Sequence, residues 1–71
     1  MRVQMSQYWG GETYPYRAAN VYYDKEKEVY EVDFISKGEV IEVRQMVTDG
    51  VAHSESYAED AAENWCLGYG W

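Results

Sequence analysis

The sequence predicts an α+β fold: a three-stranded antiparallel meander in the order 1-2-3, with one C-terminal helix packed on one face of the sheet. Apolar and polar residues alternate in three consecutive segments, as is typical of half-buried strands. After Thr48-Asp49-Gly50 this alternation stops and a period of about 3.6 residues begins, which is typical of an amphipathic helix. All 71 residues are expected to form this single β-β-β-α domain.

The strands of the meander follow from the alternation. Residues 17–24 are expected to form its first strand, and residues 29–35 show the clearest alternation and form the second. Residues 37–38, Lys-Gly, are a turn signal because glycine tolerates a positive φ, so residues 39–47 are expected to return as the third strand. Residues 2–8 are expected to form an additional N-terminal strand, whose place relative to the meander the sequence leaves open.

The helix is predicted by its cap and by its apolar stripe. Ser56 and Glu59 have the spacing of a capping box, so a helix of about eleven residues is expected to start near Ser56. Gly68 suits the left-handed position just after the helix. We expect the stripe to cover the inner face of the sheet, with its tryptophan at the centre of the core. The stripe consists of Ala58, Ala61, Ala62 and Trp65.

The two-residue turn also predicts which residues share the outer face of the sheet. The expected pairs there are Ile35 with Val40, Asp33 with Glu42, Glu31 with Arg44, and Val29 with Met46. Asp33 opposite Glu42 is unfavourable, so Glu31, Asp33, Glu42 and Arg44 form a candidate charged site for a cation or a basic partner. Alternatively, both carboxylates are solvated and Arg44 neutralises one of them.

Apolar residues at the ends of this outer face indicate a second candidate site. A single small sheet with one helix leaves a face and two edges uncovered, and a second copy of the chain could cover them. We therefore expect a homodimer; the alternative is a monomer with scattered surface hydrophobic residues. The candidate interface consists of Tyr22, Val29, Ile35, Val40 and Met46.

The charge balance excludes one class of partner. With 6 basic and 13 acidic side chains the net charge is -7, and residues 49–71 carry five acids and no Lys or Arg. Such a surface repels phosphates, so direct binding to nucleic acid is not expected. The acids of the helix instead suggest an inhibitor that imitates nucleic acid on a basic partner protein. The candidate acidic helix face consists of Glu55, Glu59, Asp60 and Glu63.

The sequence contains no recognisable catalytic, metal or cofactor motif, so we expect a protein that is not an enzyme and has no cofactor. His53 is the one histidine, with no second ligand near it in sequence, and is expected to be a plain loop residue. Cys66 is expected to be an inert helix residue. No apolar run has the length of a signal peptide or a membrane span, so a soluble cytoplasmic protein with no membrane partner is expected.

Aromatic residues exceed what the predicted core needs. We expect the surplus rings to pack the two ends of the chain over the sheet or across a dimer, since no basic groove accompanies them for base stacking. The surplus residues are Tyr8, Trp9, Tyr14, Tyr16, Tyr22, Tyr69 and Trp71.

Residues 16–69 carry two motifs, Tyr-Glu-Val-Asp-Phe at residues 30–34 and Ser-Tyr-Ala-Glu-Asp-Ala-Ala at residues 56–62. In this order of strands and helix the chain resembles HicB-like antitoxin domains, in which a Ser or Thr cap and an Ala-rich helix follow three strands. It also resembles small uncharacterised proteins of marine bacteriophages, with a second strand of the form Tyr-x-Val-x-Phe. The phage resemblance implies a location in the host cytoplasm. The 71 residues contain no counterpart of the DNA-binding segment that HicB proteins usually add.

Taken together, the residues predict a homo-oligomeric protein-protein interaction module. Two alternatives remain from the same residues. One is the acidic inhibitor of a basic partner, which would use the acidic helix face. The other is a small-molecule or cation binder, which would use Asp33, Glu42 and the neighbouring tyrosines.

Overall fold

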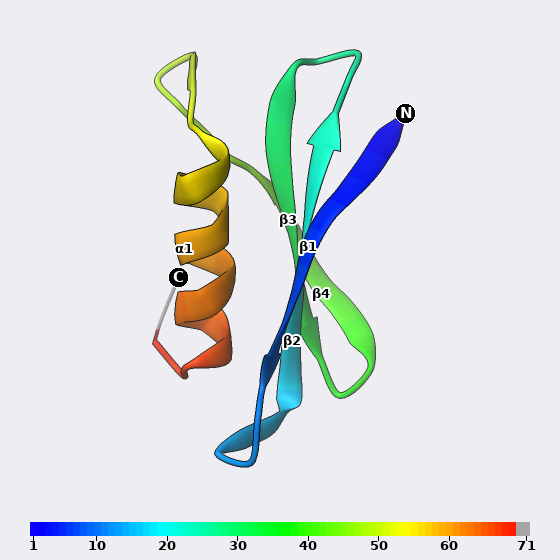
Figure 1. Cartoon of the computed structure of the whole chain (residues 1–71), viewed down its shortest axis with the longest axis vertical. Helices are drawn as coiled ribbons and strands as arrows, with labels where there is room; N and C mark the ends of the chain where they lie inside the picture. Colours follow the sequence, from blue (N-terminus) through cyan, green and yellow to red (C-terminus); the bar gives the residue numbers. More distant parts are fainter. Residues whose placement is uncertain (70–71) are drawn as a thin grey trace.

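The computed structural model describes residues 1–69 and contains one antiparallel sheet, a small second hairpin and one helix (Figure 1). The larger sheet has four strands in the order β1-β2-β3-β4, and β5 pairs only with β6. The α+β class is confirmed, but the sheet has four strands and not three, because the N-terminal segment pairs with the strand that follows it. The elements are β1 (Arg2–Gly10), β2 (Tyr14–Asp24), β3 (Val29–Ser36), β4 (Glu39–Gln45), β5 (Val47–Thr48), β6 (Val51–Ala52) and α1 (Glu55–Cys66).

The alternation of apolar residues over residues 17–24 and 29–35 predicts Ala19 opposite Phe34 and Val21 opposite Val32, and this register is confirmed. In β2 and β3, Ala19 lies opposite Phe34 and Val21 opposite Val32, and these four side chains are buried beneath the helix. Their alternation with polar neighbours was strong enough to determine the register, because a slip of one residue would turn every apolar side chain away from the core.

The predicted register of β4 is wrong beyond its first residues. Ile35 does face Val40, but a β-bulge follows, so that Asp33 faces Val43 and Phe34 faces Glu42. The extra residue in the bulge moves every later side chain of β4 to the opposite face from the one predicted. The turn residues Lys37 and Gly38 both have positive φ, of 54° and 80°, as a regular two-residue hairpin turn requires. This turn determines only the strand pairs next to it.

The same shift carries Met46 into the core. Its backbone N–H donates to Tyr30 O at 2.8 Å, and Tyr30 lies on the face that the helix covers. Met46 is the largest fully buried side chain, although the sequence placed it on the outer face opposite Val29 as part of an interface. Met46 is therefore a core residue and is withdrawn from the candidate interface.

The helix is capped two residues earlier than predicted. Ser54 has an extended backbone, and its hydroxyl accepts a hydrogen bond from Tyr57 N at 3.3 Å. Ser56 lies inside the first turn, so the predicted capping box with Glu59 does not form. Only Ser56 has the glutamate three residues later that a capping box requires, but only Ser54 has the non-helical backbone that a cap requires.

The predicted end of the helix is confirmed. Gly68 has φ of +88°, and its N–H donates to Trp65 O while Tyr69 N donates to Asn64 O. These two bonds form a Schellman motif. A side chain at Gly68 would also collide with the ring of Tyr14, which lies closer to the position of a Cβ than van der Waals contact allows. The end of the helix is thus pressed against the start of β2.

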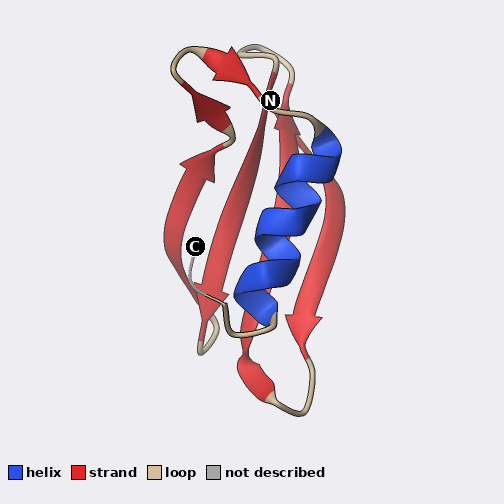
Figure 2. Ribbon diagram, turned by 90° about the vertical axis from the view of Figure 1, so that its left-hand side faces the viewer, coloured by secondary structure: helices blue, strands red, loops and turns tan. Residues whose placement is uncertain are grey.

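Helix α1 lies diagonally across β1, β2 and β3, and β4 extends beyond it (Figure 2). Ala58, Ala61 and Ala62 are fully buried, so the helix backbone approaches the sheet closely. Trp65 was predicted to lie at the centre of the core. It is instead partly buried at the border of the core, where its ring packs edge-on against that of Phe34. The alanines leave room beneath the helix, and Met46 is one of the buried side chains of the core there.

The loop between β2 and β3 is organised by Asp24. Its Oδ1 accepts hydrogen bonds from Glu26 N at 2.9 Å and Lys27 N at 3.2 Å. The donated N–H groups, that of Lys27 above all, hold the pKa of Asp24 below its ordinary value. The loop between β2 and β3, which carries the charged residues 25–28, is therefore closed by one carboxylate.

Replacing Met46 with Ala should lower the free energy of unfolding by about 2 to 5 kcal/mol, because it leaves a cavity beneath the helix. The exposed Val51 is the control, and Val51→Ala should change stability by less than about 0.5 kcal/mol. Urea denaturation monitored by circular dichroism measures both. Equal effects of the two variants would contradict the placement of Met46 in the core.

Replacing Asp24 with Asn should destabilise the protein at neutral pH. Because folding lowers the pKa of Asp24, its stabilising effect is present above the pKa of the unfolded chain, about 3.9, and is lost as the pH falls through the folded value. The difference between wild type and Asp24→Asn should therefore shrink on acidification, which unfolding curves at several pH values would measure. Asp60→Asn, at an exposed helix position, removes the same charge as a control; a gap that stays constant with pH would contradict this role of Asp24.

Candidate functional site

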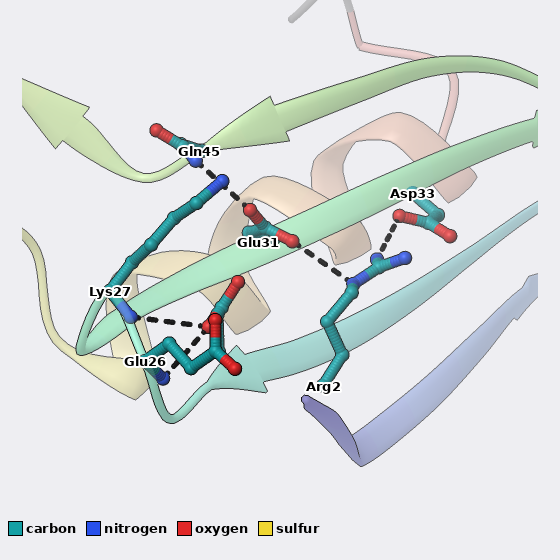
Figure 3. Close-up of polar contacts among 7 residues, drawn as sticks. Arg2, Glu26, Lys27, Glu31, Asp33 and Gln45 are labelled. Atoms are coloured by element: carbon teal, nitrogen blue, oxygen red, sulfur yellow. Dashed lines mark hydrogen bonds and ion pairs between the residues drawn. The ribbon is translucent and has the colours of Figure 1, made fainter.

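The face of the sheet that α1 does not cover is organised by Arg2. The Arg2 side chain extends from β1 across β2 to two acids on β3 (Figure 3). Its Nε lies 3.0 Å from Glu31 Oε1, and its Nη2 donates to Asp33 Oδ1. On the way the guanidinium lies over the ring of Tyr22, 3.9 Å from the centroid. One cation thus joins three strands through ion pairs and a cation-π contact.

The two acids are far less exposed than acids usually are. The side chains of Glu31 and Asp33 are 7% and 10% exposed, whereas Arg2 is 35% exposed. Gln45 Nε2 donates to the second oxygen of Glu31 at 3.1 Å, so both oxygens of this carboxylate have partners. Since buried carboxylates need compensating charge and hydrogen bonds, Arg2 and Gln45 are what allow the acids to be buried.

The side chain of Asn20 lies beside this cluster. Asn20 pairs with Asp33 across β2 and β3. Within residues 1–69, its Oδ1 is buried and has no hydrogen-bond partner. A carbonyl oxygen next to a carboxylate adds no positive charge, so the charge balance of Asp33 rests on Arg2.

The candidate charged site of the sequence is therefore divided between the two faces. Glu31 and Asp33 lie on the face of the sheet that α1 does not cover, which we call the open face. Glu42 and Arg44 come after the bulge and therefore lie on the opposite face. Arg44 Nη2 lies 2.6 Å from Glu42 Oε2, an exposed pair within one strand. The predicted conflict between Asp33 and Glu42 does not exist, and with it the reason to expect a cation between them.

Sequence reasoning missed Arg2 because 31 residues separate it from Asp33 and the register of β1 contains irregularities. One signal was available. Two acids on a face of the predicted second strand require a cation, and Arg2 is the one basic residue in residues 1–16.

The edge of β4 that faces away from β3 is the least covered part of the sheet, and we refer to it as the β4 edge. Val40, Ile41 and Val43 are 53%, 55% and 53% exposed, and the helix does not reach them. An apolar edge strand with unpaired backbone groups is a template for pairing with another chain. In the register predicted from the turn, Val40, Glu42 and Arg44 share the outer face, which would turn Ile41 and Val43 toward the core; the bulge reverses the face of Val43.

The remaining members of the predicted interface lie on the open face, but most are partly covered. Tyr22 lies under Arg2, and Val29 and Ile35 are half-buried. Val40 alone of the five predicted residues is both apolar and exposed. The apolar surface is thus shifted from the ends of the open face, where it was predicted, to the β4 edge.

The acidic helix face is narrower than the sequence suggests. Glu55 Oε1 accepts a hydrogen bond from Tyr30 at 3.4 Å, and Glu59 Oε2 accepts one from Ser6 at 3.5 Å, so both acids lean toward the sheet. Burial, and secondarily Glu55, raises the pKa of Tyr30. Only Asp60 and Glu63 of this group are fully exposed.

Several of the surplus aromatic residues surround Arg17 at the C-terminal end of the helix. Its guanidinium lies 4.1 Å from the centroid of Trp65 and donates to Trp65 O at 3.0 Å, with Tyr14 and Tyr16 nearby. A cation at this end of a helix is favourable for the helix dipole. These rings therefore have a structural role within the chain, whereas Trp71, also among the surplus residues, lies outside the described residues.

A cavity of about 140 Å³ lies between the end of β4, the β5-β6 hairpin and the start of α1. The ring of His53 stacks on Tyr57 at 3.8 Å, and its Nε2 lies 2.7 Å from Thr48 Oγ1. This volume is well below the roughly 300 Å³ at which pockets for cofactors and drug-sized ligands begin. At the far end of α1, burial raises the pKa of the Cys66 thiol, which makes it a poor nucleophile.

Within residues 1–69, no group of three or more His, Cys, Asp and Glu side chains is arranged to hold a metal ion. In the same part of the chain, no helix has the length and apolar character needed to cross a membrane.

Comparison of the chain with protein-family models, curated proteins and solved structures gave no match. The resemblance to HicB-like and phage proteins therefore stays a prediction from the sequence pattern, and function has to be argued from the geometry alone.

Replacing Arg2 with Met should lower the free energy of unfolding by about 2 kcal/mol or more, because Glu31 and Asp33 would stay buried without their cation. Lys25→Met is the control. It removes one positive charge from an exposed loop position and should change stability by less than about 1 kcal/mol. Thermal and urea unfolding measure both variants, and equal losses would show that Arg2 is an ordinary surface residue.

Proposed function

We propose that this protein is a non-enzymatic protein-interaction module that binds by accepting an additional strand at the β4 edge. The observation that carries the proposal is the row of Val40, Ile41 and Val43, each more than half exposed on a strand that, within residues 1–69, has a neighbour on one side only. Strand addition satisfies free backbone groups by main-chain hydrogen bonds, while alternate side chains supply specificity.

The hydrogen-bond ladder supports this proposal. Met46 N donates to Tyr30 O, so the backbone groups of even-numbered residues near this end of β4 point toward β3. In an antiparallel ladder successive residues alternate, and the N–H and C=O groups of Val43 and Gln45 therefore point outward from the β4 edge. An incoming strand would find donors and acceptors beside an exposed valine.

The opposite edge of the sheet is less suited to docking. Strand β1 has two register shifts, between Gln4 and Ser6 and between Trp9 and Gly10. Strand β4 has one, between Val40 and Glu42, and is regular from Glu42 to Gln45, the stretch that contains Val43. Bulges twist an edge and interrupt its row of free groups, which is a common way of blocking strand addition.

The two alternative functions receive less support. An acidic inhibitor needs a broad negative face, but two of its four helix acids turn toward the sheet. A cation binder needs free carboxylates, but Arg2 occupies both acids of the open face.

A matched pair of variants tests the proposal. Val43→Pro removes the outward N–H without removing a bond to β3, and Val43→Ala keeps it. Extended nonapeptides selected from a randomised library on sparsely immobilised wild type should bind Val43→Ala and lose at least about tenfold in affinity for Val43→Pro, measured by fluorescence anisotropy. Peptides that bind both variants equally, or a selection without enrichment, would overturn docking at the β4 edge.

A further inference from the structure

We propose that the strand received at the β4 edge is β4 of a second copy of this chain, antiparallel and centred on Val43. This inference rests on the proposed function, since it names the partner of the same edge. The sequence alone predicted a homodimer through other residues of the sheet, and only the bulge in β4 brings the residues used here to the edge.

The backbone permits a symmetric pairing centred on Val43. Because the N–H and C=O groups of Val43 point outward, the two Val43 residues can exchange both hydrogen bonds across a two-fold axis. Residues on either side then pair by the rule that their numbers sum to twice 43. Within the regular stretch that follows the bulge, Glu42 of each chain therefore lies opposite Arg44 of the other, and the two exposed valines contact each other.

The charges favour this register over its neighbours. Pairing centred on Val43 places Glu42 of each copy opposite Arg44 of the other, so two complementary pairs form at once. Pairing centred on Glu42 would oppose two glutamates, and pairing centred on Arg44 would oppose two arginines. Glu42 and Arg44 are 45% and 42% exposed, and in the free chain they bind each other, so both side chains already lie at the edge.

The resulting dimer has a continuous sheet of 4 + 4 strands, with both helices on one face. The pairing brings the two Val43 side chains together, each of them 53% exposed in the free chain, and leaves the Arg2 cluster of each copy on the open face. Although each copy carries a net charge of -7, the contact itself is locally neutral.

Charge reversal at the two positions tests the register. Glu42→Arg changes the net charge from -7 to -5, and Arg44→Glu changes it to -9. Although these changes are opposite in sign, each places two residues of like charge opposite each other at both symmetry-related contacts of the dimer. Each should weaken dimerisation at least about tenfold, and the double variant Glu42→Arg with Arg44→Glu should restore the wild-type dissociation constant within about threefold. Sedimentation equilibrium of the full chain over a range of concentrations measures these constants, with circular dichroism melting as the check that each variant folds.

The outcomes separate this inference from the proposed function. A wild-type chain that stays monomeric up to about 1 mM, where even weak contacts form, would overturn the second copy as partner. In that case peptides that distinguish Val43→Ala from Val43→Pro would leave the proposed function standing, whereas their absence would remove both. A dimer that tolerates Val43→Pro, or that weakens with only one of the two single reversals, would also overturn pairing centred on Val43.

Discussion

The close contact between α1 and the sheet determines what the rest of the molecule has to do. Three alanines bring the helix backbone near β2, and a helix of 12 residues, about 18 Å long, covers β1 to β3 but not β4. Two consequences follow. Met46, just after the end of β4, is needed as a buried side chain to complete the core. Strand β4 is left with an apolar row that nothing in the described chain covers.

The uncovered face of the sheet solves a different problem, since no second layer shields it. There Arg2 compensates Glu31 and Asp33 and holds β1 against the remaining strands. A slip of β1 by one residue would turn Arg2 to the helix side and leave two buried carboxylates without a cation. We therefore interpret the cluster chiefly as a device that fixes the register of an N-terminal strand whose apolar pattern is weak.

Local patterns predicted much of this fold, and long-range ones did not. The β2-β3 register, the turn at Lys37-Gly38 and the left-handed Gly68 each follow from a few neighbouring residues. The bulge near Ile41 has no such signature, because no glycine marks it, and it reversed the predicted faces of the later part of β4. Of the candidate site, the acids of β3 were recognised, but their cation lies 31 residues from Asp33 and depends on an irregular strand.

The position of the helix in the chain has a consequence for biosynthesis. All four strands precede α1, so on a ribosome the inner face of the sheet, with Val21, Val32 and Phe34, emerges before the alanines that cover it. A nascent chain at this stage carries both a bare apolar face and an open edge, which are the two features that promote aggregation of partly folded proteins. During translation the chain therefore depends on the arrival of α1, or on a chaperone, for its solubility.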